Sequence, residues 1–563
     1  MMKRPLFIVL AVLVAVGLIL SGCGEKTTTT TTTQTTTTQT TGTQTTTTQT
    51  TTTQTTSTQT TTPPPAGVVT GGILKAIVTG GPAMMSYRGR MGPADATYTF
   101  PASEYLVEPE LKADGTRGWI PFLCESYNID PVGKTFTFNL RKGVKFSDGS
   151  EMTASVVKWN FQQDIDNGWL QEADKITSID TPDNYTVVIH FTVYSNQYEF
   201  NWGWTTIFSQ AAWEANAGTD KSTTSEEGIA WAVDHCVGTG PFILKEYKRD
   251  VSMTFVKNPD YWQKGKPYLD GIEFLIIPEA TTASALLQAG DVDMWYQGSA
   301  AQDWEELAGI GFKVQNFWPG LPMAIYPNTV DPKSKWQDIR LRQALEYALD
   351  KATIAAALGR GFYRPLAQLA PETEWGYIPD LDVREYNVEK AKALIAETGL
   401  PTPVPVTLLV MNNPANVDGG EAIKQYLDAA GFDVTLDLAD PGRYYGSVFG
   451  TGWADLVYMF YGMNNTNLEM YYSWFSVDPK SYLRGMMRTA YQVQEDAVAS
   501  LIFDKAEQAA ATADLLKNIY EAATVIPCWL PPATVVAPTY VHHDTYKHGF
   551  IRQDWENVWM DKH

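Results

Sequence analysis

Cysteine and histidine are scarce in this sequence, and their scarcity excludes several classes of protein. There are four cysteines and six histidines in 563 residues, and no two cysteines form a C-x-x-C pair. Disulfide-stapled small domains and zinc ribbons need closely spaced cysteines, so we expect neither. The motifs G-x-S-x-G, H-E-x-x-H and G-x-x-x-x-G-K-[ST] are also absent. Serine hydrolase, zinc protease and nucleotide-hydrolysing activities therefore have no motif support.

Basic residues are also few relative to acidic ones. The chain has 42 Lys and Arg against 63 Asp and Glu, a formal net charge of −21 at pH 7. A surface of this sign repels phosphate backbones and anionic lipid, so we expect no nucleic acid partner and no nonspecific membrane adsorption. By contrast, 44% of the residues are hydrophobic and 12% are aromatic. That composition and this length are sufficient for a large body of several domains.

The N-terminus has the layout of an export signal. Lys3 and Arg4 precede an apolar run over residues 6–20, which is shorter than the ~20 apolar residues of a membrane-spanning helix. The run ends in Leu20-Ser21-Gly22-Cys23, which resembles a bacterial lipobox, so we expect residues 1–22 to be removed and Cys23 to carry the lipid anchor. The protein would then sit on the outer face of the cell membrane, in the periplasm or at the cell surface. The alternative is an ordinary signal peptide cleaved nearby.

A tether follows the anchor. Residues 27–62 are almost all Thr, with Gln at every fifth position from 34 to 59, and three prolines close the segment at 63–65. With almost no apolar side chain the segment cannot bury enough surface to fold, so we expect residues 23–67 to be a disordered tether. As a random coil, the Thr-rich stretch 27–62 spans roughly 30 to 36 Å. Its Thr hydroxyls suit O-linked sugar, and a bare spacer is an equal alternative.

From residue 68 the patterns of strands and helices alternate. Short alternating or apolar runs predict strands, and a helix after the N-cap residue Asp338 and another from Asn387 to Gly399 are legible from their caps and apolar faces. The predicted strands cover residues 72–78, 135–140, 185–193 and 271–277. The clearest unit is a strand at 406–411, a helix at 421–430 and a strand at 432–438. This βαβ order predicts a parallel sheet.

Several motifs together resemble one family. Residues 133–149 read G-K-T-F-T-F-N-L-R-K-G-V-K-F-S-D-G, and with residues 123–127 they closely resemble the signature of family 5 extracellular solute-binding proteins, the receptors of peptide, nickel and oligosaccharide ABC importers. Further blocks match in order: V-G-T-G-P-F at 237–242, N-P-D-Y-W at 258–262, K-P-Y-L-D-G-I at 266–272, L-Q-A-G-D-V-D at 287–293 and D-I-R-L-R-Q-A-L at 338–345. The resemblance runs from about residue 70 to the C-terminus.

The resemblance implies an α/β fold of two lobes, a periplasmic-binding-protein-like fold of type II, cluster C, with an extra subdomain in the first lobe. By analogy lobe I takes residues 68–111, 238–328 and 526–563, its subdomain takes 112–237, and lobe II takes 329–525. Hinge strands are expected near Asn328 and about residue 526. The implied function is that of a monomeric substrate-binding lipoprotein, without enzymatic activity or cofactor. It would capture a peptide-like or other oligomeric solute and deliver it to an ABC permease and ATPase complex.

Ligand contacts are expected in the loops that leave the carboxyl ends of the strands. Two such loops are rich in uncharged amides, and they contribute Asn412 from 412–416 and Asn464 and Asn467 from 462–467. Peptide-binding relatives carry a stretch like Trp-Gly-x-Asp-Tyr-x-Asp-Pro at the second loop, and its carboxylate pairs with the ammonium of the peptide. This chain has no carboxylate there. A blocked or unusual peptide, or an oligosaccharide, therefore becomes more plausible than a peptide with a free amino group.

Aromatic side chains are the other candidate ligand contacts, because a ring face suits sugar rings and apolar groups alike. Tyr461 occupies the aromatic position of the family and is expected to stack on the ligand. Weaker candidates are Trp295, Trp204, Trp474 and Tyr87. Most of the 18 tryptophans must nevertheless belong to the core.

Two alternative functions and two further residue groups complete the expectations. A secreted glycoside hydrolase needs only two carboxylates, and a solute sensor would share the fold; an enzyme would turn its ligand over and a receptor would not. His542, His543 and His548 have a spacing that suits a transition metal, but a surface loop is the simpler interpretation and we expect no metal. Cys124, Cys236 and Cys528 are expected to be buried free thiols.

Overall fold

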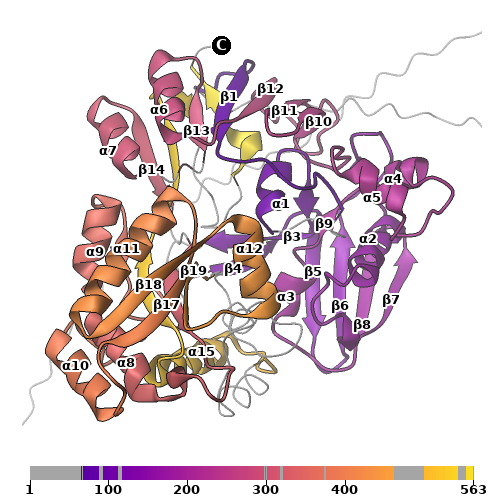
Figure 1. The fold of residues 1–563 in the computed structure, drawn as a ribbon. Helices are drawn as coiled ribbons and strands as arrows, with labels where there is room; N and C mark the ends of the chain where they lie inside the picture. The colour runs from indigo at the N-terminus through magenta and orange to yellow at the C-terminus, as the bar shows by residue number, and fades with distance from the viewer. Residues whose placement is uncertain are drawn as a thin grey trace, which may run out of the picture. The chain divides into compact units, whose positions relative to one another are not determined.

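The computed structural model describes residues 65, 67–87, 93–111, 117–296, 298, 301–317, 321–372, 376–461, 500–542 and 553–561. Within these ranges the fold consists of three larger sheets, three two-stranded sheets and the helices that cover them (Figure 1). No helix of the described ranges combines the length and the apolar character that crossing a bilayer requires.

A seven-stranded sheet forms the centre of lobe I. Its order is β10 (Phe242–Lys248), β11 (Ser252–Lys257), β12 (Gly271–Ile276), β1 (Ile73–Val78), β13 (Met294–Tyr296), β21 (Ala533–Ala537) and β14 (Lys313–Phe317). β1 pairs in parallel with β12 and β13, and β10, β11, β14 and β21 add antiparallel pairs. The predicted strands at 72–78 and 271–277 are confirmed as β1 and β12. α6 (Ala280–Ala289) and α7 (Ala301–Gly309) pack on one face of this sheet around Trp295 and Trp304.

A four-stranded antiparallel sheet forms the subdomain. Its order is β5 (Cys124–Asp130), β6 (Thr135–Leu140), β8 (Thr186–Phe191) and β7 (Ile176–Asp183). The predicted strands at 135–140 and 185–193 are confirmed as β6 and β8. α2 (Ala154–Asp166) covers this sheet, and the short α3 (Tyr198–Asn201) packs into the same core through Tyr198. Between subdomain and lobe I lie two-stranded sheets, β2 (Glu104–Tyr105) with β9 (Thr206–Ile207) and β3 (Val107–Leu111) with β4 (Arg117–Pro121).

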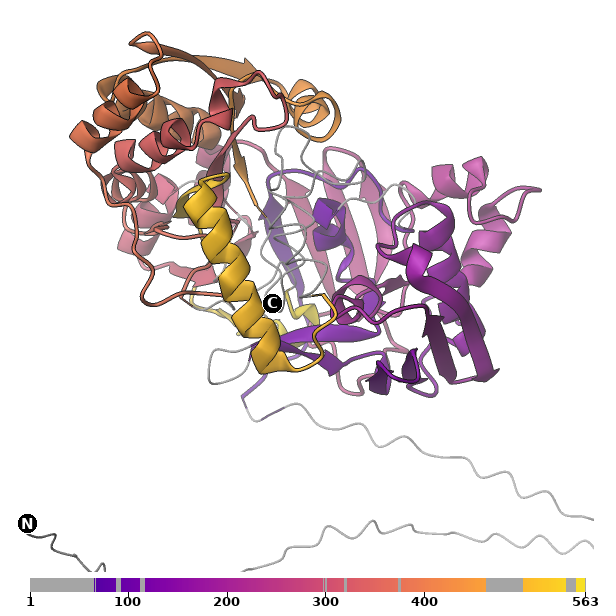
Figure 2. The same cartoon turned by 90° about the horizontal axis from the view of Figure 1, so that it is seen from below.

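A six-stranded mixed sheet forms the centre of lobe II. Its order is β16 (Arg364–Pro365), β20 (Ile526–Leu530), β15 (Met323–Pro327), β19 (Leu456–Phe460), β17 (Val404–Met411) and β18 (Phe432–Ala439). β17 and β18 are parallel along their whole length, so the predicted βαβ unit is confirmed. Leu408 of β17 packs toward α8 (Ile339–Ala348), α10 (Val388–Glu397) and α11 (Pro414–Ala429). Its neighbour Leu409 packs toward α15 (Lys505–Ala522) on the other face, the long yellow helix of Figure 2.

The remaining described elements are shorter or lie at the periphery of the sheets. They are α1 (Pro93–Thr99), η1 (Ala173–Lys175), α4 (Gln210–Asn216), α5 (Glu226–Ala232), η2 (Lys335–Gln337), α9 (Lys351–Gly359), α12 (Pro441–Gly446), η3 (Ser447–Thr451), η4 (Trp555–Asn557), and the pair β22 (Val541–His542) and β23 (Trp559–Met560). The predicted caps are also present. Asp338 accepts a hydrogen bond from the Arg340 amide, and Asn387 accepts one from the Lys390 amide.

Two strands pair in a different lobe from the one expected from the sequence. β15 and β20 were expected in lobe I, but both pair within the six-stranded sheet. The chain therefore leaves the seven-stranded sheet after β14 and returns to it between β20 and β21, at Pro531 and Pro532. We place one crossing between the end of β14 at Phe317 and the start of β15 at Met323, and the other at 531–532, on the lobe I side of the expected positions near 328 and 526.

Cys124, Cys236 and Cys528 are buried free thiols, as predicted. Burial raises the pKa of Cys124 to about 11 and those of Cys236 and Cys528 to about 12. Thiols with such pKa values are protonated at neutral pH and unreactive. They therefore act as small apolar core residues in three different hydrophobic clusters.

Candidate ligand-binding site

Three parallel strands of lobe II end at one edge of their sheet. β17 is parallel to both β18 and β19, and the residues that follow these strands are Asn412, Asp440 and Tyr461. In open α/β sheets, ligands bind outside the carboxyl ends of the strands. This edge of lobe II is therefore the first wall of the candidate site.

Asn412, a predicted ligand contact, is exposed at this edge. Its backbone amide donates to the Ala439 carbonyl at 2.7 Å, which fixes its position between β17 and β18. Asn413 has a different role, because its side chain accepts a hydrogen bond from the Asn416 amide and caps α11. Residues 414–416, expected in a loop, are the first turn of that helix. Of the expected loop 412–416, only residues 412 and 413 precede the helix.

Tyr445 is a second exposed group at the same edge, and the sequence analysis did not identify it. It lies on α12, directly after β18, with 37% of its surface exposed. Its ring stacks on Phe449 with a centroid distance of 5.6 Å and an interplanar angle of 3°. The neighbouring Tyr444 is buried, and its hydroxyl donates to the Tyr458 carbonyl at 2.7 Å. The sequence feature that points to Tyr445 is an aromatic pair shortly after the carboxyl end of a parallel strand.

An ion pair holds α12 in place. Both oxygens of Asp437 accept hydrogen bonds from the Arg443 guanidinium, at 2.9 and 2.6 Å. Those hydrogen bonds lower the pKa of the Asp437 carboxyl below its ordinary value. Asp440 caps the helix by accepting from the Arg443 amide at 3.1 Å. The position of Tyr445 is therefore set by charged contacts within lobe II.

Tyr461 and two other aromatic candidates are buried. The Tyr461 ring is fully buried, and its hydroxyl donates to the Leu369 carbonyl at 2.6 Å. Trp295 is 1% exposed and packs among core residues of β13, α6 and α7. Tyr87 donates to the Ser209 carbonyl at 2.6 Å and packs against Trp213 at 4.8 Å. In this structure all three belong to the core and present no ring face to a solute.

Trp204, by contrast, lies in a half-buried aromatic group of the subdomain, which we call the aromatic trio: Trp119, Phe200 and Trp204. Their ring centroids are 6.0, 6.4 and 5.4 Å apart. Trp119 and Phe200 were not predicted. The trio is the second wall of the candidate site.

The aromatic trio is connected to lobe II by a chain of hydrogen bonds. The Tyr127 hydroxyl lies 3.0 Å from both the Trp119 carbonyl and Glu199 Oε1. Glu199 Oε2 in turn accepts from Lys505 Nζ of lobe II at 2.7 Å. The trio therefore borders the junction of the two lobes, and ligand pockets occur preferentially at such junctions.

Several predicted residues fall elsewhere. Cys23, Asn464, Asn467 and Trp474 lie outside the described residues. Asn328 follows β15, and its amide donates to the Asp455 carbonyl at 2.7 Å while its side-chain amide donates to the Trp453 carbonyl at 2.6 Å. It therefore ties strand ends within lobe II, downstream of the chain crossing.

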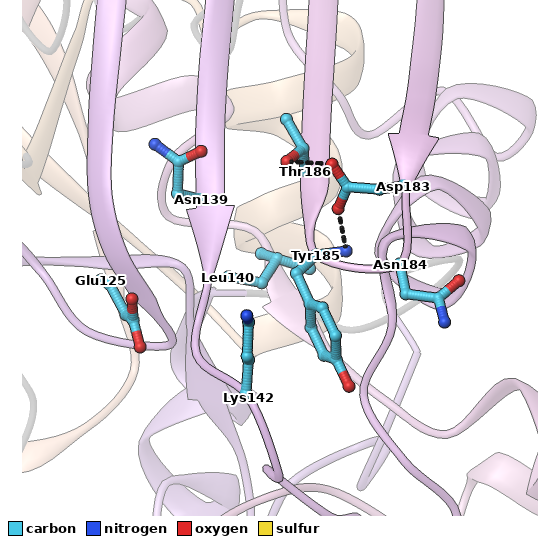
Figure 3. A pocket seen from close by; sticks show the side chains of 8 residues that line it. All are labelled: Glu125, Asn139, Leu140, Lys142, Asp183, Asn184, Tyr185 and Thr186. Carbon is cyan, nitrogen blue, oxygen red and sulfur yellow. Dashed lines mark hydrogen bonds between the residues drawn. The ribbon is translucent and has the colours of Figure 1, made fainter.

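A polar hollow of about 620 Å³ lies at one end of the subdomain sheet (Figure 3). Lys142 Nζ lies 5.5 Å from the centroid of the Tyr185 ring, and Asp183 accepts from the Tyr185 amide and the Thr186 hydroxyl, each at 2.8 Å. The other lining residues are Glu125, Asn139, Leu140 and Asn184. None of the predicted ligand residues lines this hollow, so it is separate from the candidate site.

The histidine group does not form a metal site within the described ranges. The His542 ring stacks on Trp559 at 3.8 Å, and its Nε2 lies 3.0 Å from Asp561. His543 and His548 lie outside the described residues. Among the residues that are described, no group of three or more His, Cys, Asp or Glu side chains could hold a metal ion.

Comparisons with known proteins agree with this architecture. Residues 118–482 match the family model of bacterial extracellular solute-binding proteins, family 5. The chain is 31% identical to heme-binding protein A of Haemophilus influenzae over 309 residues, which are 50% of this chain and 54% of that protein. It is 28% identical to the dipeptide-binding protein of Escherichia coli over 336 residues, 55% and 60% of the two chains. The chain thus aligns over little more than half the length of these curated relatives.

A solved structure extends the likeness to nearly the whole body. The periplasmic binding protein DppA of Helicobacter pylori, in complex with the peptide STSA, superposes with a TM-score of 0.76 at 22% identity. The superposition covers 88% of this chain and 99% of that one. At this identity the likeness establishes the two-lobed α/β fold. The family match over 118–482, which is more than half of the chain, shows that the chain belongs to family 5 of the bacterial extracellular solute-binding proteins.

Proposed function

We propose that this chain is the substrate-binding lipoprotein of an ABC importer. It captures a peptide-like or other oligomeric solute between its two lobes and delivers that solute to a membrane permease and its ATPase. The observation that carries the proposal is the family match over residues 118–482. Proteins of this family are transport binding proteins and not enzymes, which argues against the glycoside hydrolase alternative.

The names of the relatives support a peptide-like solute. Dipeptide-binding and oligopeptide-binding proteins are among the curated relatives, and the superposed Helicobacter pylori protein was solved with a peptide. Heme-binding and nickel-binding proteins are also among them. The family alone therefore leaves the solute class open, and the site has to narrow it.

The chemistry of the two walls favours a solute bound through uncharged groups. Of the charged side chains next to the walls, Arg443 pairs with Asp437, Lys505 pairs with Glu199, and Asp440 caps α12. Asn412, Tyr445 and the aromatic trio then offer an amide and ring faces. Peptide groups and apolar side chains suit such walls, and so do sugar rings, which keeps an oligosaccharide as the alternative solute.

The location and domain limits complete the proposal. The relatives include periplasmic proteins, so the body acts outside the cytoplasm. Cys23 is proposed as the lipidated residue and residues 23–67 as the tether that holds the body above the membrane. We propose that lobe II spans residues 321–530 and that lobe I with its subdomain takes the rest of the body, with the lobes closing over the solute as in other two-lobed receptors.

Native mass spectrometry of the chain purified without denaturation tests this proposal. A co-purifying ladder of peptide masses is the expected result. Masses spaced by hexose units would overturn the peptide assignment in favour of an oligosaccharide receptor. If the purified chain converts any such solute chemically, the transport function itself is wrong.

A further inference from the structure

Two segments from different lobes meet at the edge of the candidate site. Residues 194–199 belong to the subdomain and residues 500–505 lead into α15 of lobe II. The Asn196 amide donates to the Ser500 carbonyl at 2.8 Å, and Lys505 Nζ lies 2.7 Å from Glu199 Oε2. The Tyr194 and Phe503 rings meet edge to face at 5.4 Å. We call these three interactions the lobe contact.

The subdomain half of the lobe contact is fixed by its own lobe. Ser195 Oγ and Asn201 Nδ2 donate to one oxygen of Glu172, at 3.0 and 3.1 Å. Gln197 Nε2 donates to Asn196 Oδ1 at 2.5 Å, and the Tyr198 ring stacks on Trp202 at 3.6 Å in the subdomain core. The segment is therefore held in shape whether or not lobe II is present.

The lobe II half is fixed in the same manner. Gln508 is fully buried, and its Nε2 donates to the carbonyls of Ile502 and Phe503 at 2.8 and 3.3 Å. Asp504 caps α15 by accepting from the amides of Ala506 and Glu507. Two preformed surfaces that meet lose little conformational freedom on association, which makes their contact more favourable.

The lobe contact lies far from the points where the chain crosses between lobes. α15 begins at Lys505 and leads to β20, which directly precedes the crossing at Pro531 and Pro532. Its 18 residues span about 27 Å at the rise of an α-helix, and Figure 2 shows the helix as one straight element. Along the chain, the lobe contact is thus separated from this crossing by the whole of α15 and of β20.

A second pair of lobe-to-lobe interactions lies beside the crossings. Trp304 of α7, the helix before β14, meets Phe362 edge to face at 5.6 Å, and Arg360 lies 3.1 Å from Glu305. Phe362 precedes β16, which pairs with β20. When lobes rotate about a hinge, contacts beside it move little and contacts remote from it separate. Opening therefore leaves the Trp304 contact and breaks the lobe contact.

The lobe contact is too small for a permanent interface. Phe503 remains 55% exposed, and its neighbours Leu501 and Val193 remain 49% and 39% exposed. A permanent protein interface buries far more surface than one ring pair, one ion pair and one backbone hydrogen bond. Interactions of this size suit an equilibrium in which both the closed and the open arrangement are populated.

We propose that the lobe contact is a latch that stabilises the closed arrangement of the lobes through protein groups alone and so helps to set the affinity for the solute. The latch stabilises the closed form before a solute adds its own contacts. Because a solute bound between the walls binds the closed form best, a change in the latch changes the apparent affinity in proportion to the fraction of closed chains. This consequence for affinity rests on the proposed function; the latch itself does not.

Distance measurements between two spin labels test the latch. The full chain is kept in mild detergent, because its N-terminus is expected to carry lipid, and the labels replace Val132 of the subdomain, 92% exposed, and Glu389 of α10, 79% exposed. The native thiols at 124, 236 and 528 are buried and do not compete for label. Any co-purified solute is first removed by dialysis, and native mass spectrometry confirms that none remains. The unaltered chain is expected to populate a short and a long distance.

Variants of the lobe contact are expected to shift weight from the short to the long distance. Phe503→Ala should lower the ratio of closed to open about three- to tenfold, as expected for an aromatic pair. Lys505→Gln should lower it about two- to fivefold, as expected for an exposed ion pair. Lys517→Gln on the same helix makes the same change in charge at an exposed position and should leave the ratio unchanged. Raising NaCl from 0.1 to 1 M should lower the ratio for the unaltered chain and not for Lys505→Gln.

The latch is wrong if the double variant Phe503→Ala, Lys505→Gln keeps the distribution of the unaltered chain, or if Lys517→Gln shifts it equally. The salt titration of the unaltered chain tests the ion pair of the latch without any substitution in the lobe contact, so a variant that fails to fold does not leave the question open. No solute takes part in these measurements. Failure of the latch therefore leaves solute capture intact, whereas failure of the proposed function appears as the absence of a bound solute in the chain as first purified.

Discussion

Glu172 is a carboxyl group whose surroundings disfavour its charge. Burial raises the pKa of Glu172 to about 7, and the hydrogen bonds from Ser195 and Asn201, with the nearby charge of Lys175, lower it only in part. When the pKa of a carboxyl group is higher in the folded than in the unfolded chain, ionisation of that group lowers the free energy of unfolding. The contribution of Glu172 is therefore neutral well below pH 4.5 and becomes increasingly unfavourable as the pH rises through 7.

Glu172→Gln is expected to remove this pH dependence. Glutamine keeps an oxygen that accepts from Ser195 and Asn201 but carries no charge, so the variant should be more stable than the unaltered chain at pH 8 by on the order of 2 kcal/mol and equal to it at pH 4. Denaturant unfolding at the two pH values measures the difference. Asp174→Asn, a neighbouring carboxylate that is 65% exposed, is the control and should show a smaller gain, because its charge only adds to the effect of burial on Glu172. Parallel pH profiles for Glu172→Gln and the unaltered chain would contradict the assignment.

A substitution of Tyr445 tests whether the first wall of the candidate site binds the solute. Replacing it by alanine removes an exposed ring while Arg443 and Asp437 continue to hold α12. We expect Tyr445→Ala to weaken binding of the co-purifying solute about tenfold, the loss typical of one stacked ring, and to change the melting temperature by no more than a few degrees. Isothermal titration calorimetry measures the affinity.

The matched control for Tyr445 is Tyr386→Ala. Tyr386 is also in lobe II and 45% exposed, and its ring meets Tyr426 edge to face. It lies just before α10, not at the carboxyl edge of β18. Equal losses of affinity for the two variants would show that Tyr445 has no specific role in the site.

Glu104 explains why two of the family motifs have the residues they have. Its fully buried carboxylate accepts from the Thr239 hydroxyl, the Tyr261 hydroxyl and the Trp262 indole at 2.7 to 2.8 Å. Thr239 belongs to the V-G-T-G-P-F motif, and Tyr261 and Trp262 belong to N-P-D-Y-W. A buried carboxylate requires such donors. The motifs that identified the family are therefore structural, which is why they revealed the fold and not the solute.

At the scale of elements, strands were predictable because the period of two survives in β6 and β8, where one face is buried. The helix was predicted from residue 421, directly after Gly419 and Gly420, whereas α11 begins at Pro414. Both glycines are needed for packing, since a Cβ on Gly419 would lie 2.7 Å from the Tyr458 hydroxyl and one on Gly420 would lie 3.0 Å from Val410. Glycine is required at these two positions because the helix lies close to the sheet, and not because the chain turns there.

The site was predictable only in part for a related reason. The position of Asn412 follows from the rule that ligands bind at the carboxyl ends of parallel strands. Tertiary packing decides which aromatic ring is exposed, and no local sequence pattern predicts it. Trp295 and Tyr461 are fully buried or nearly so, while Tyr445, which was not considered, is exposed.

Two neighbouring asparagines at the start of α11 have different expected roles: Asn413 caps the helix, and Asn412 contacts the solute. Asn413→Ala removes the N-cap and is expected to lower the free energy of unfolding by about 1 kcal/mol without changing solute affinity. Asn412→Ala removes an exposed amide and should weaken solute binding while leaving the free energy of unfolding within about 0.5 kcal/mol. Denaturant unfolding and calorimetry on both variants measure this. The same pattern of effects for the two variants would mean that the loop and the cap act as one unit.

At the scale of the molecule, the two crossings determine how the lobes move. The described crossing at Pro531 and Pro532 joins β20 of one sheet to β21 of the other. Each proline ring fixes φ near −65°, so this connection has little freedom to bend. A stiff crossing restricts the lobes to few arrangements, and a latch remote from it can then select between them.

Replacing both prolines by glycine is therefore expected to broaden the motion and not to shift it. In Pro531→Gly, Pro532→Gly the distance between labels at 132 and 389 should spread around both the short and the long value, whereas Lys505→Gln only moves weight from one value to the other. The double glycine variant should also lose about 1 to 2 kcal/mol of stability, because glycine increases the freedom of the unfolded chain. Pro538→Gly, beyond β21 within lobe I, controls for that loss and should leave the distances as they are. Distributions of unchanged width in the double variant would show that the prolines of this crossing do not control the lobe motion.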